Sequence, residues 1–284
     1  MNFVEELGKN NKQSQNSKFQ LKDKMLLTFI RLRCCISYRF LSWLFQISIS
    51  SVAKYIQETL EIIHKVVYRI FFSYVNQFIF KNVVGSIQIL KSIEERKIYW
   101  FDLDDGFTYS LIIDGMKHQI FSCSQKGIGS STFSGKKGYN TFTMLIAVNK
   151  EGTIWFISNS YPGSNNDINL SNFKENHLCD YLTSEEKIAA DQGFRNLENL
   201  SIYTHIQKPK NSREKEFNSQ FKQYRCTVEN AIGQLRKWKI CCYRFYSKIF
   251  ELNKALKEYH FLMEILAGLV NKFVMPLRKY TSIS

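Results

Sequence analysis

Three acidic residues stand at positions where their carboxylates could act together. Asp114 follows the apolar run SLII and Asp191 follows KIAA, so we expect each to end a buried strand. Acids at strand ends gather at the edge of an α/β sheet where ligands bind. Glu229 lies within a long predicted helix beside the apolar Val228, and an acid at the border of a buried face needs a proton or a cation.

Carboxylates that converge repel one another, and a divalent cation relieves the repulsion. Mg²⁺ or Mn²⁺ accepts oxygen ligands and keeps waters. Two such ions about 4 Å apart can activate a water and stabilise the leaving oxygen of a phosphodiester. Asp167, in GSNND, is a fourth candidate ligand, although it also suits a helix N-cap. A single acid is better explained by a salt bridge, as between Arg225 and Glu229, so the metal site depends on the acids jointly.

The elements that must carry these acids read as an α/β core. We expect strands at SLIIDGM, YNTFTMLIAVN, TIWFISNSY, KIAAD and YTHIQKP. A helix should follow PGSNND, and further helices are expected from about Arg213 to Lys239 and from about Leu256 to Phe273. A Gly- and Ser-rich loop is expected over 125–138, and a short helix near 87–93. Three strands in a meander, followed by alternating helices and strands, predict a mixed sheet flanked by helices, in the order of the RNase H-like fold.

The first part of the chain predicts a small all-α domain. Residues 20–75 are helical in pattern, with a tight turn at 46–48 and Ser48 as an N-cap. A short helix, a turn and a second helix describe a helix-turn-helix, whose second helix enters the major groove of DNA. The residues expected to contact DNA are Ser50, Ser51, Lys54 and Gln57. A three-helix bundle without DNA contacts has the same pattern, so both interpretations stay open.

The charge of the chain points to a polyanionic partner. Its formal net charge is +14, from 39 Lys and Arg against 25 Asp and Glu. Nucleic acid is the first candidate and an anionic membrane surface the second, while a generally basic proteome needs no partner at all. Lys136 and Lys137 suit contacts to a phosphate backbone. The apolar stretch 40–53 is too short for a membrane span, and we expect no association with membranes.

Five segments in order carry a family resemblance: IIDGM, FSGKKGYNTFTMLIAV, GTIWFISNSYPGSNNDINL, AADQGF and YRCTVENAIGQLRKWK. Together they resemble the DDE-superfamily endonuclease domain of Harbinger-type transposases, which is related to bacterial IS5-type enzymes. The segment LKDKMLLTFIRLRCCISYRFLSWLFQISISSVAKYI resembles the helix-turn-helix that precedes this domain. The resemblance covers about residues 20–275.

The resemblance implies site residues. Asp114 matches the first catalytic aspartate and Glu229 the catalytic glutamate. Topology favours Asp191 as the second aspartate, whereas some relatives assign that role to the block that contains Asp167. Arg225, Glu229 and Arg236 resemble the family's R-E-K helix pattern, with Arg236 in place of the usual lysine, and both arginines are expected to contact DNA. Gln192 departs from the Arg or Ser that relatives often carry.

The resemblance also implies an activity and its setting. We expect a DNA endonuclease or transposase that uses Mg²⁺ or Mn²⁺ in a two-metal mechanism on double-stranded transposon ends. Its expected location is the nucleus, with a Myb-like accessory DNA-binding protein and a homo-oligomer as further expectations. A domesticated DNA-binding protein without transposition is the alternative. An RNA nuclease of the same fold is disfavoured, because A-form RNA hides its major groove from a helix.

These expectations divide the chain into segments. The predicted domains are a polar tail (1–18), a helix-turn-helix domain (19–75), a linker (76–107), an RNase H-like endonuclease domain (108–275) and a second tail (276–284).

Overall fold

The structure is a computed structural model that describes most of both predicted domains. The described residues are 19–72, 87–88, 101–102, 108–121, 127–165, 186–194, 202–204, 206–245 and 251–274, with side chains omitted at a few of these positions. Asp167 and the helix expected after PGSNND lie outside these residues, as do the two predicted tails.

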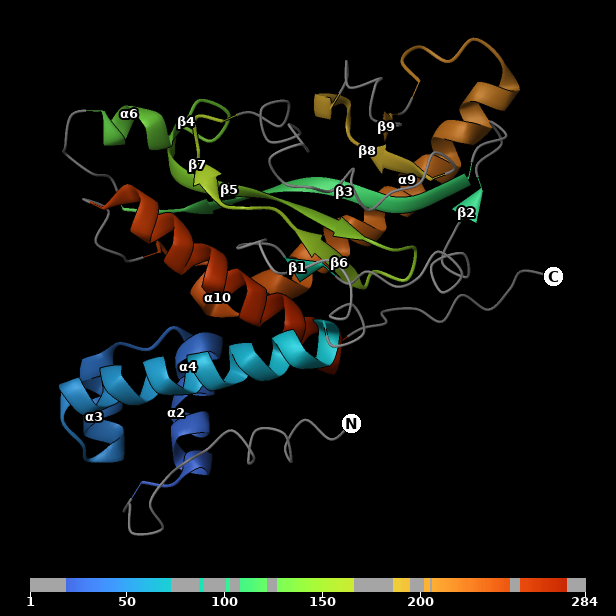
Figure 1. Cartoon of the computed structure of the whole chain (residues 1–284). Helices are drawn as coiled ribbons and strands as arrows, with labels where there is room; N and C mark the ends of the chain where they lie inside the picture. Colours follow the sequence, from blue (N-terminus) through green and yellow to red (C-terminus); the bar gives the residue numbers. More distant parts are fainter. Residues whose placement is uncertain are drawn as a thin grey trace.

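A mixed sheet forms the centre of the molecule (Figure 1). Its strands run in the order β1-β6-β5-β3-β8-β9, with β2, β4 and β7 pairing beside this path. The bounds are β1 (Ile87–Gln88), β2 (Phe101–Asp102), β3 (Thr108–Gln119), β4 (Phe133–Ser134), β5 (Tyr139–Val148), β6 (Ile154–Ile157), β7 (Tyr161–Pro162), β8 (Lys187–Ala190) and β9 (Ile202–Tyr203).

The strand pairing confirms the predicted RNase H-like core. β3, β5 and β6 form an antiparallel meander, and β8 and β9 continue the sheet in parallel from β3. The alternation of side chains explains why one sheet carries two apolar clusters. Ile112 and Ala189 face one cluster, whereas Ile113 and Ala190 face the other.

Four local predictions were wrong. The strand expected at YTHIQKP shortens to β9, which ends at Tyr203, and residues 206–209 form no strand. Asp114 does not end its strand, because residues 115–119 of β3 go on pairing with β5. The segment expected to be a loop contains the short helix α6 (Ile128–Thr132) and β4, and a turn at residues 135–138 follows β4. The helix expected near residue 87 begins as strand β1, because Ile87 pairs with Ile157 of β6.

Two long helices cover one face of the sheet (Figure 1). They are α9 (Ser212–Arg236) and α10 (Leu252–Phe273). α9 begins where Asn211 accepts a hydrogen bond from the Glu214 amide at 2.8 Å, as an N-cap does. All five apolar residues predicted for its inner face are buried, namely Phe217, Phe221, Val228, Ile232 and Leu235.

The N-terminal helices have the predicted helix-turn-helix order. They are α2 (Leu21–Cys34), α3 (Tyr38–Phe45) and α4 (Ile49–Phe72). The Ser48 hydroxyl accepts from the Ser51 amide at 3.1 Å, which confirms Ser48 as the N-cap of α4. Among the helices that the structure describes, none combines the length and apolarity needed to cross a membrane.

The helix-turn-helix packs directly on the sheet domain. α4 crosses α10 so closely that a Cβ on Gly268 would lie 2.2 Å from Val67 Cγ1. Ile63, Val66 and Val67 of α4 are buried in the same cluster as the sheet and α10. On α2, Arg33 Nη1 donates to the Lys237 carbonyl at 2.8 Å, just beyond the end of α9. The two predicted domains therefore meet in one hydrophobic cluster, while the helix-turn-helix keeps a second cluster of its own, formed by Leu27, Leu41, Val52 and Ile56.

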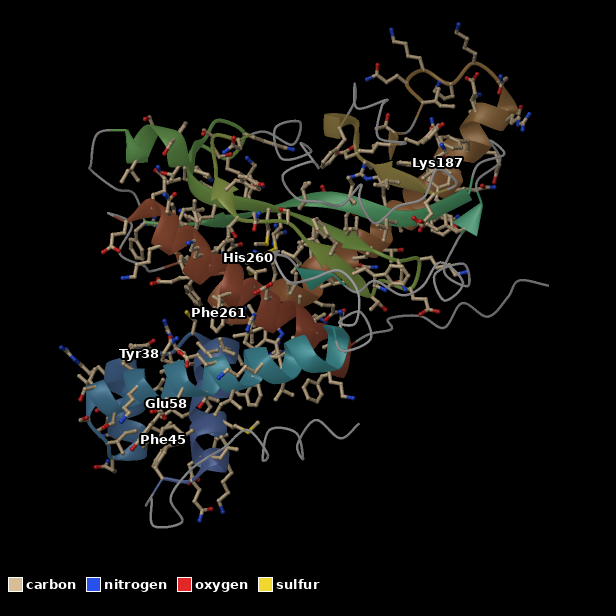
Figure 2. All side chains as sticks on the ribbon, viewed as in Figure 1. Tyr38, Phe45, Glu58, Lys187, His260 and Phe261 are labelled. Atoms are coloured by element: carbon tan, nitrogen blue, oxygen red, sulfur yellow. The ribbon has the colours of Figure 1, made fainter. Side chains whose placement is uncertain are left out.

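A buried cluster of one glutamate and two histidines lies at the crossing of α4 and α10. Glu264 Oε2 lies 2.8 Å from His64 Nε2 of α4, and Glu264 Oε1 lies 3.3 Å from His260 Nε2, one turn away on α10. His260 and its neighbour Phe261 mark this part of α10 in Figure 2. Burial alone would raise the pKa of Glu264, but the interactions with His260 and His64 outweigh it and lower that pKa to about 2.

Two helical glycines give a matched test of the α4–α10 packing. Gly268→Ala forces its new methyl against the buried Val67, so we expect it to lower the free energy of unfolding by about 1–3 kcal/mol. Gly233→Ala on α9 meets nothing within 4 Å, so it should instead raise that free energy by about 1 kcal/mol. Chemical denaturation measures both, and equal effects of the two substitutions would contradict the close packing.

The Glu264 cluster predicts a pH-dependent contribution to stability. Because its pKa is lower in the folded protein than its ordinary 4.5, the ionised form favours folding above pH 4.5, and this contribution is lost as the pH falls toward 2. Glu264→Gln should cost about 2–3 kcal/mol at pH 7 and less at pH 3. Denaturant unfolding at both pH values tests this, with the exposed Glu258→Gln as control, and a cost that does not shrink at pH 3 would refute it.

Candidate active site

One arginine joins two of the predicted carboxylates. Arg225 Nη1 lies 3.2 Å from Asp191 Oδ1, and Arg225 Nη2 lies 3.0 Å from Glu229 Oε1. Asp191 comes directly after β8, whereas Arg225 and Glu229 are one turn apart on α9. The guanidinium therefore connects the end of a central strand to the helix that covers the sheet.

Backbone geometry explains this meeting. Ala189 faces the side of the sheet that α9 covers and Ala190 faces the other side, so the next residue, Asp191, returns to the α9 side. On α9, residues four apart lie on the same face of the helix, which places Glu229 beside Arg225. The buried Val228 anchors the helix next to Glu229 and leaves the Glu229 carboxylate half-exposed.

The third acid stands on the neighbouring strand. The parallel register of β3 and β8 pairs Ile113 with Ala190, so the following residues are Asp114 and Asp191. Asp114 alternates with Ile113 and so faces the side that α9 covers. Its Oδ1 accepts a hydrogen bond from the Gly115 amide at 2.7 Å. The sheet therefore brings Asp114 and Asp191 to adjacent positions on one face.

The acids do not form a closed ligand cluster in this structure. Within the residues described, no group of three His, Cys, Asp or Glu side chains is arranged to hold a metal ion. The expectation that Asp114, Asp191 and Glu229 converge on one point is thus met only in part, because Arg225 lies between the latter two. The donor set still fits a hard divalent cation, because all its donors are carboxylate oxygens and two of them already share a positive group.

The energy of the Arg225 ion pairs is small. The Asp191, Arg225 and Glu229 side chains are 37%, 27% and 52% exposed. Ion pairs with this exposure contribute about 1 kcal/mol or less each, because water screens them. Another cation can therefore replace the Arg225 guanidinium beside Asp191 and Glu229 at little cost in energy.

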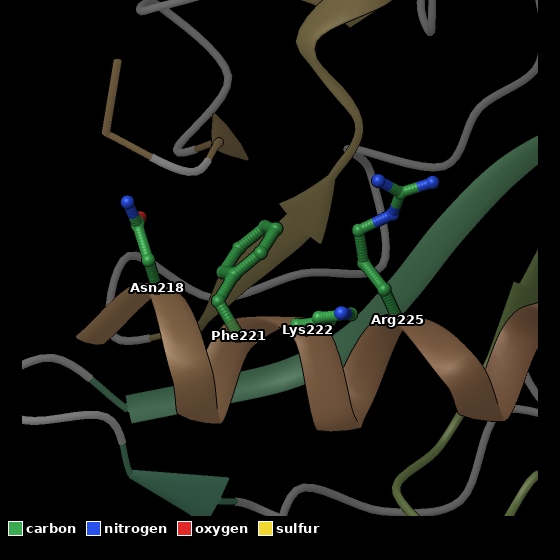
Figure 3. Close-up of a pocket in the computed structure, with 4 residues that line it drawn as sticks. All are labelled: Asn218, Phe221, Lys222 and Arg225. Carbon is green, nitrogen blue, oxygen red and sulfur yellow. The ribbon is translucent and has the colours of Figure 1, made fainter. Parts of the chain in front are cut away.

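A hollow of about 230 Å³ opens beside Arg225 (Figure 3). Asn218, Phe221, Lys222 and Arg225 of α9 line it. Figure 3 shows Asn218, Phe221 and Arg225 projecting from one side of the helix. The amide of Asn218 is fixed by hydrogen bonds of 2.8 Å to both backbone groups of Ile206. The hollow is smaller than the roughly 300–1,000 Å³ pockets of drug-sized ligands.

The other predicted basic contacts lie farther along the core. Lys136 and Lys137 are exposed in the turn between β4 and β5. Arg236 is exposed in the last turn of α9, two turns beyond Glu229. None of these three residues contributes to the Arg225 ion pairs.

The residues predicted to read DNA lie on the first half of α4. Ser50, Lys54 and Gln57 are exposed, and Ser51 is half-buried. The hydroxyls of Ser50 and Ser51 each lie 2.8 Å from that of Ser48, so they take part in the cap of α4. This serine cluster and Lys54 occupy the helix end that a helix-turn-helix presents to DNA.

Sequence reasoning missed two features of the site. The i,i+4 spacing revealed the pair of Arg225 with Glu229, but no local signal indicated that Arg225 also binds Asp191, 34 positions earlier. Lys222, which lines the hollow, was also missed. Its place on the same helix face as Asn218 and Arg225 is a signal that helical spacing could have supplied.

Comparison with known families accounts for both parts of the fold. A model of the helix-turn-helix of DDE superfamily endonucleases matches residues 17–68. A model of the DDE superfamily endonuclease domain matches residues 113–271, which is more than half of the chain and includes Asp114, Asp191 and Glu229. The chain matches none of the curated proteins and none of the solved structures with which it was compared. With its strand order and its facing carboxylates, this chain belongs to the DDE superfamily endonuclease family.

Proposed function

We propose that this protein is a metal-dependent DNA endonuclease of the Harbinger type, which cuts the ends of a transposon. The observation that carries the proposal is that Asp191 and Glu229 both contact the guanidinium of Arg225. Asp114 lies next to them, on the neighbouring strand β3. An acidic site of this kind within a DDE endonuclease domain is suited to phosphodiester cleavage. The net charge of +14 suits a DNA substrate.

Each side chain would have a distinct role. Asp114, Asp191 and Glu229 would hold Mg²⁺ or Mn²⁺, which would supply an activated water and stabilise the leaving oxygen in a two-metal mechanism. Arg225 and Arg236, which lie on the same helix, would contact DNA phosphates. Lys136 and Lys137 would contact the DNA backbone at the edge of the sheet. Ser50, Ser51, Lys54 and Gln57 would bind the element ends.

Asp191 is our choice for the second aspartate. It follows β8, the parallel neighbour of β3. Its carboxylate contacts the same Arg225 guanidinium as Glu229 does. Asp167, the other candidate, lies outside the described residues, and the chain leading to it is anchored where Lys117 Nζ donates to the Gly163 and Asn165 carbonyls. Asp191→Asn and Asp167→Asn variants distinguish the two assignments.

The setting of the activity follows from its substrate. We propose a nuclear location, assembly as a homo-oligomer on paired ends and cooperation with a Myb-like DNA-binding protein. A domesticated protein that binds DNA without transposing it is the second candidate, because the same helix-turn-helix supports it. We also propose a binding unit (19–75) and a cutting unit (108–275), with the connecting segment 76–107 adding β1 and β2 to the sheet of the cutting unit.

The nuclease proposal predicts Mg²⁺-dependent nicking of supercoiled DNA. Glu229→Gln, Asp114→Asn and Asp191→Asn should each lower the nicking rate at least 100-fold, because each removes a charged cation ligand. Glu216→Gln removes an exposed acid from the same helix and should leave the rate unchanged. Gel assays of nicked product measure this, with the accessory protein added where the chain alone is inactive. Equal nicking by wild type and Glu229→Gln would eliminate the nuclease assignment.

The helix-turn-helix makes a separate prediction. Lys54→Ala should weaken binding to duplex DNA of any sequence and reduce the slope of log K against log salt by about 1, because one phosphate contact is lost. Lys65 is exposed in the second half of α4, which packs on the core. Lys65→Ala should therefore leave the DNA affinity and the salt slope unchanged. Fluorescence anisotropy over a salt series measures both variants. Matching slopes for Lys54→Ala and wild type would show that α4 binds elsewhere or not at all.

A further inference from the structure

Arg225 is placed to do more than contact DNA. Its two ion-pair partners, Asp191 and Glu229, are both proposed ligands of the divalent cation. One comes from the end of β8 and the other from α9, and the guanidinium reaches both within 3.2 Å. A positive group thus already lies between carboxylates that a metal ion would need.

We propose that Arg225 is a built-in counter-cation, which holds Asp191 and Glu229 in the metal-free protein and yields them when a divalent cation binds. This inference rests on the proposed function, because it takes these carboxylates to be the metal ligands. Arg225 is then a positioning residue: it keeps two like charges from separating before the cation arrives, and it competes with that cation for the same oxygens.

The physical basis is charge and exposure. Two carboxylates on facing elements repel one another, and a single guanidinium with two N–H groups neutralises that repulsion from one position. All three side chains are between a quarter and about half exposed, so the ion pairs are screened and exchange readily. A doubly charged ion attracts both carboxylates more strongly than a guanidinium does, so the exchange favours the metal once it is present.

In this proposal the released guanidinium turns toward the hollow on α9. Arg225 lines this hollow together with Lys222, three residues earlier on the same helix. Figure 3 shows Arg225 projecting from the helix side that also carries Asn218 and Phe221. Two cations at one small hollow suit a phosphate group between them. Metal binding would therefore turn Arg225 from a partner of the acids into a partner of the DNA backbone.

The test measures Mn²⁺ binding to the full chain by calorimetry, without DNA. Arg225→Gln removes the competing cation, so we expect it to bind Mn²⁺ roughly three- to tenfold more tightly than wild type. Lys215→Gln removes the same charge from an exposed position on α9 and should change the affinity less than twofold. Arg225→Lys, which keeps one charge but not the two-pronged geometry, should fall between wild type and Arg225→Gln.

A metal-free measurement separates this inference from the nuclease proposal. In EDTA, Arg225→Gln should lower the melting temperature, and adding Glu229→Gln should restore part of the loss, because the remaining Asp191 no longer faces a second charge. Unchanged or weaker Mn²⁺ binding by Arg225→Gln, or additive effects in EDTA, would overturn the counter-cation role, even if Glu229→Gln abolishes nicking. Absence of Mn²⁺ binding by wild type, with the EDTA result as expected, would overturn the metal site and the exchange while leaving the ion pairs in place.

Discussion

Parallel pairing between β3 and β8 brings Ile113 beside Ala190, and the next residue on each strand is an aspartate. The alternation of strand side chains then turns Asp114 and Asp191 toward the face that α9 covers, because Ile113 and Ala190 point the other way. α9 can add Glu229 only because its apolar residues fix its rotation on that face. The site thus depends on one strand register and one helix orientation, and a shift of either by one residue would separate the acids.

The same face of the sheet also holds the helix-turn-helix. α4 packs on α10 through Gly268 and Val67, and Glu264 contacts His64 and His260 at that crossing. Because α2 and α4 contribute to the core of the sheet domain, the proposed DNA-reading end of α4 keeps a set relation to the carboxylates. A tethered binding domain would allow many distances between binding and cutting, whereas this packing favours one. Arg225 adds local control, since it holds two acids at a spacing that a metal ion can use.

Sequence patterns predicted the elements with strong periodicity. The unbroken apolar run of β5 and the five apolar residues of α9 were recognised from spacing alone, and so was the turn before α4. Features fixed by distant partners were not. Asp114 lies within β3 rather than at its end because β5 continues to pair beyond it. Strand β1 depends on β6, and the bond between His64 and Glu264 joins residues 200 positions apart. For the site, spacing suggested the acids, but only the fold brought Arg225 to Asp191.

Asp114, Asp191 and Glu229 are proposed ligands of one divalent-cation site. Anomalous diffraction from crystals of the protein grown with Mn²⁺ tests this assignment most directly. We expect manganese peaks bound by oxygens of all three carboxylates at about 2.1 Å, and Arg225 turned away from Asp191 and Glu229. Manganese bound by Asp167 in place of Asp191, or Arg225 still between the two acids with manganese elsewhere, would contradict it.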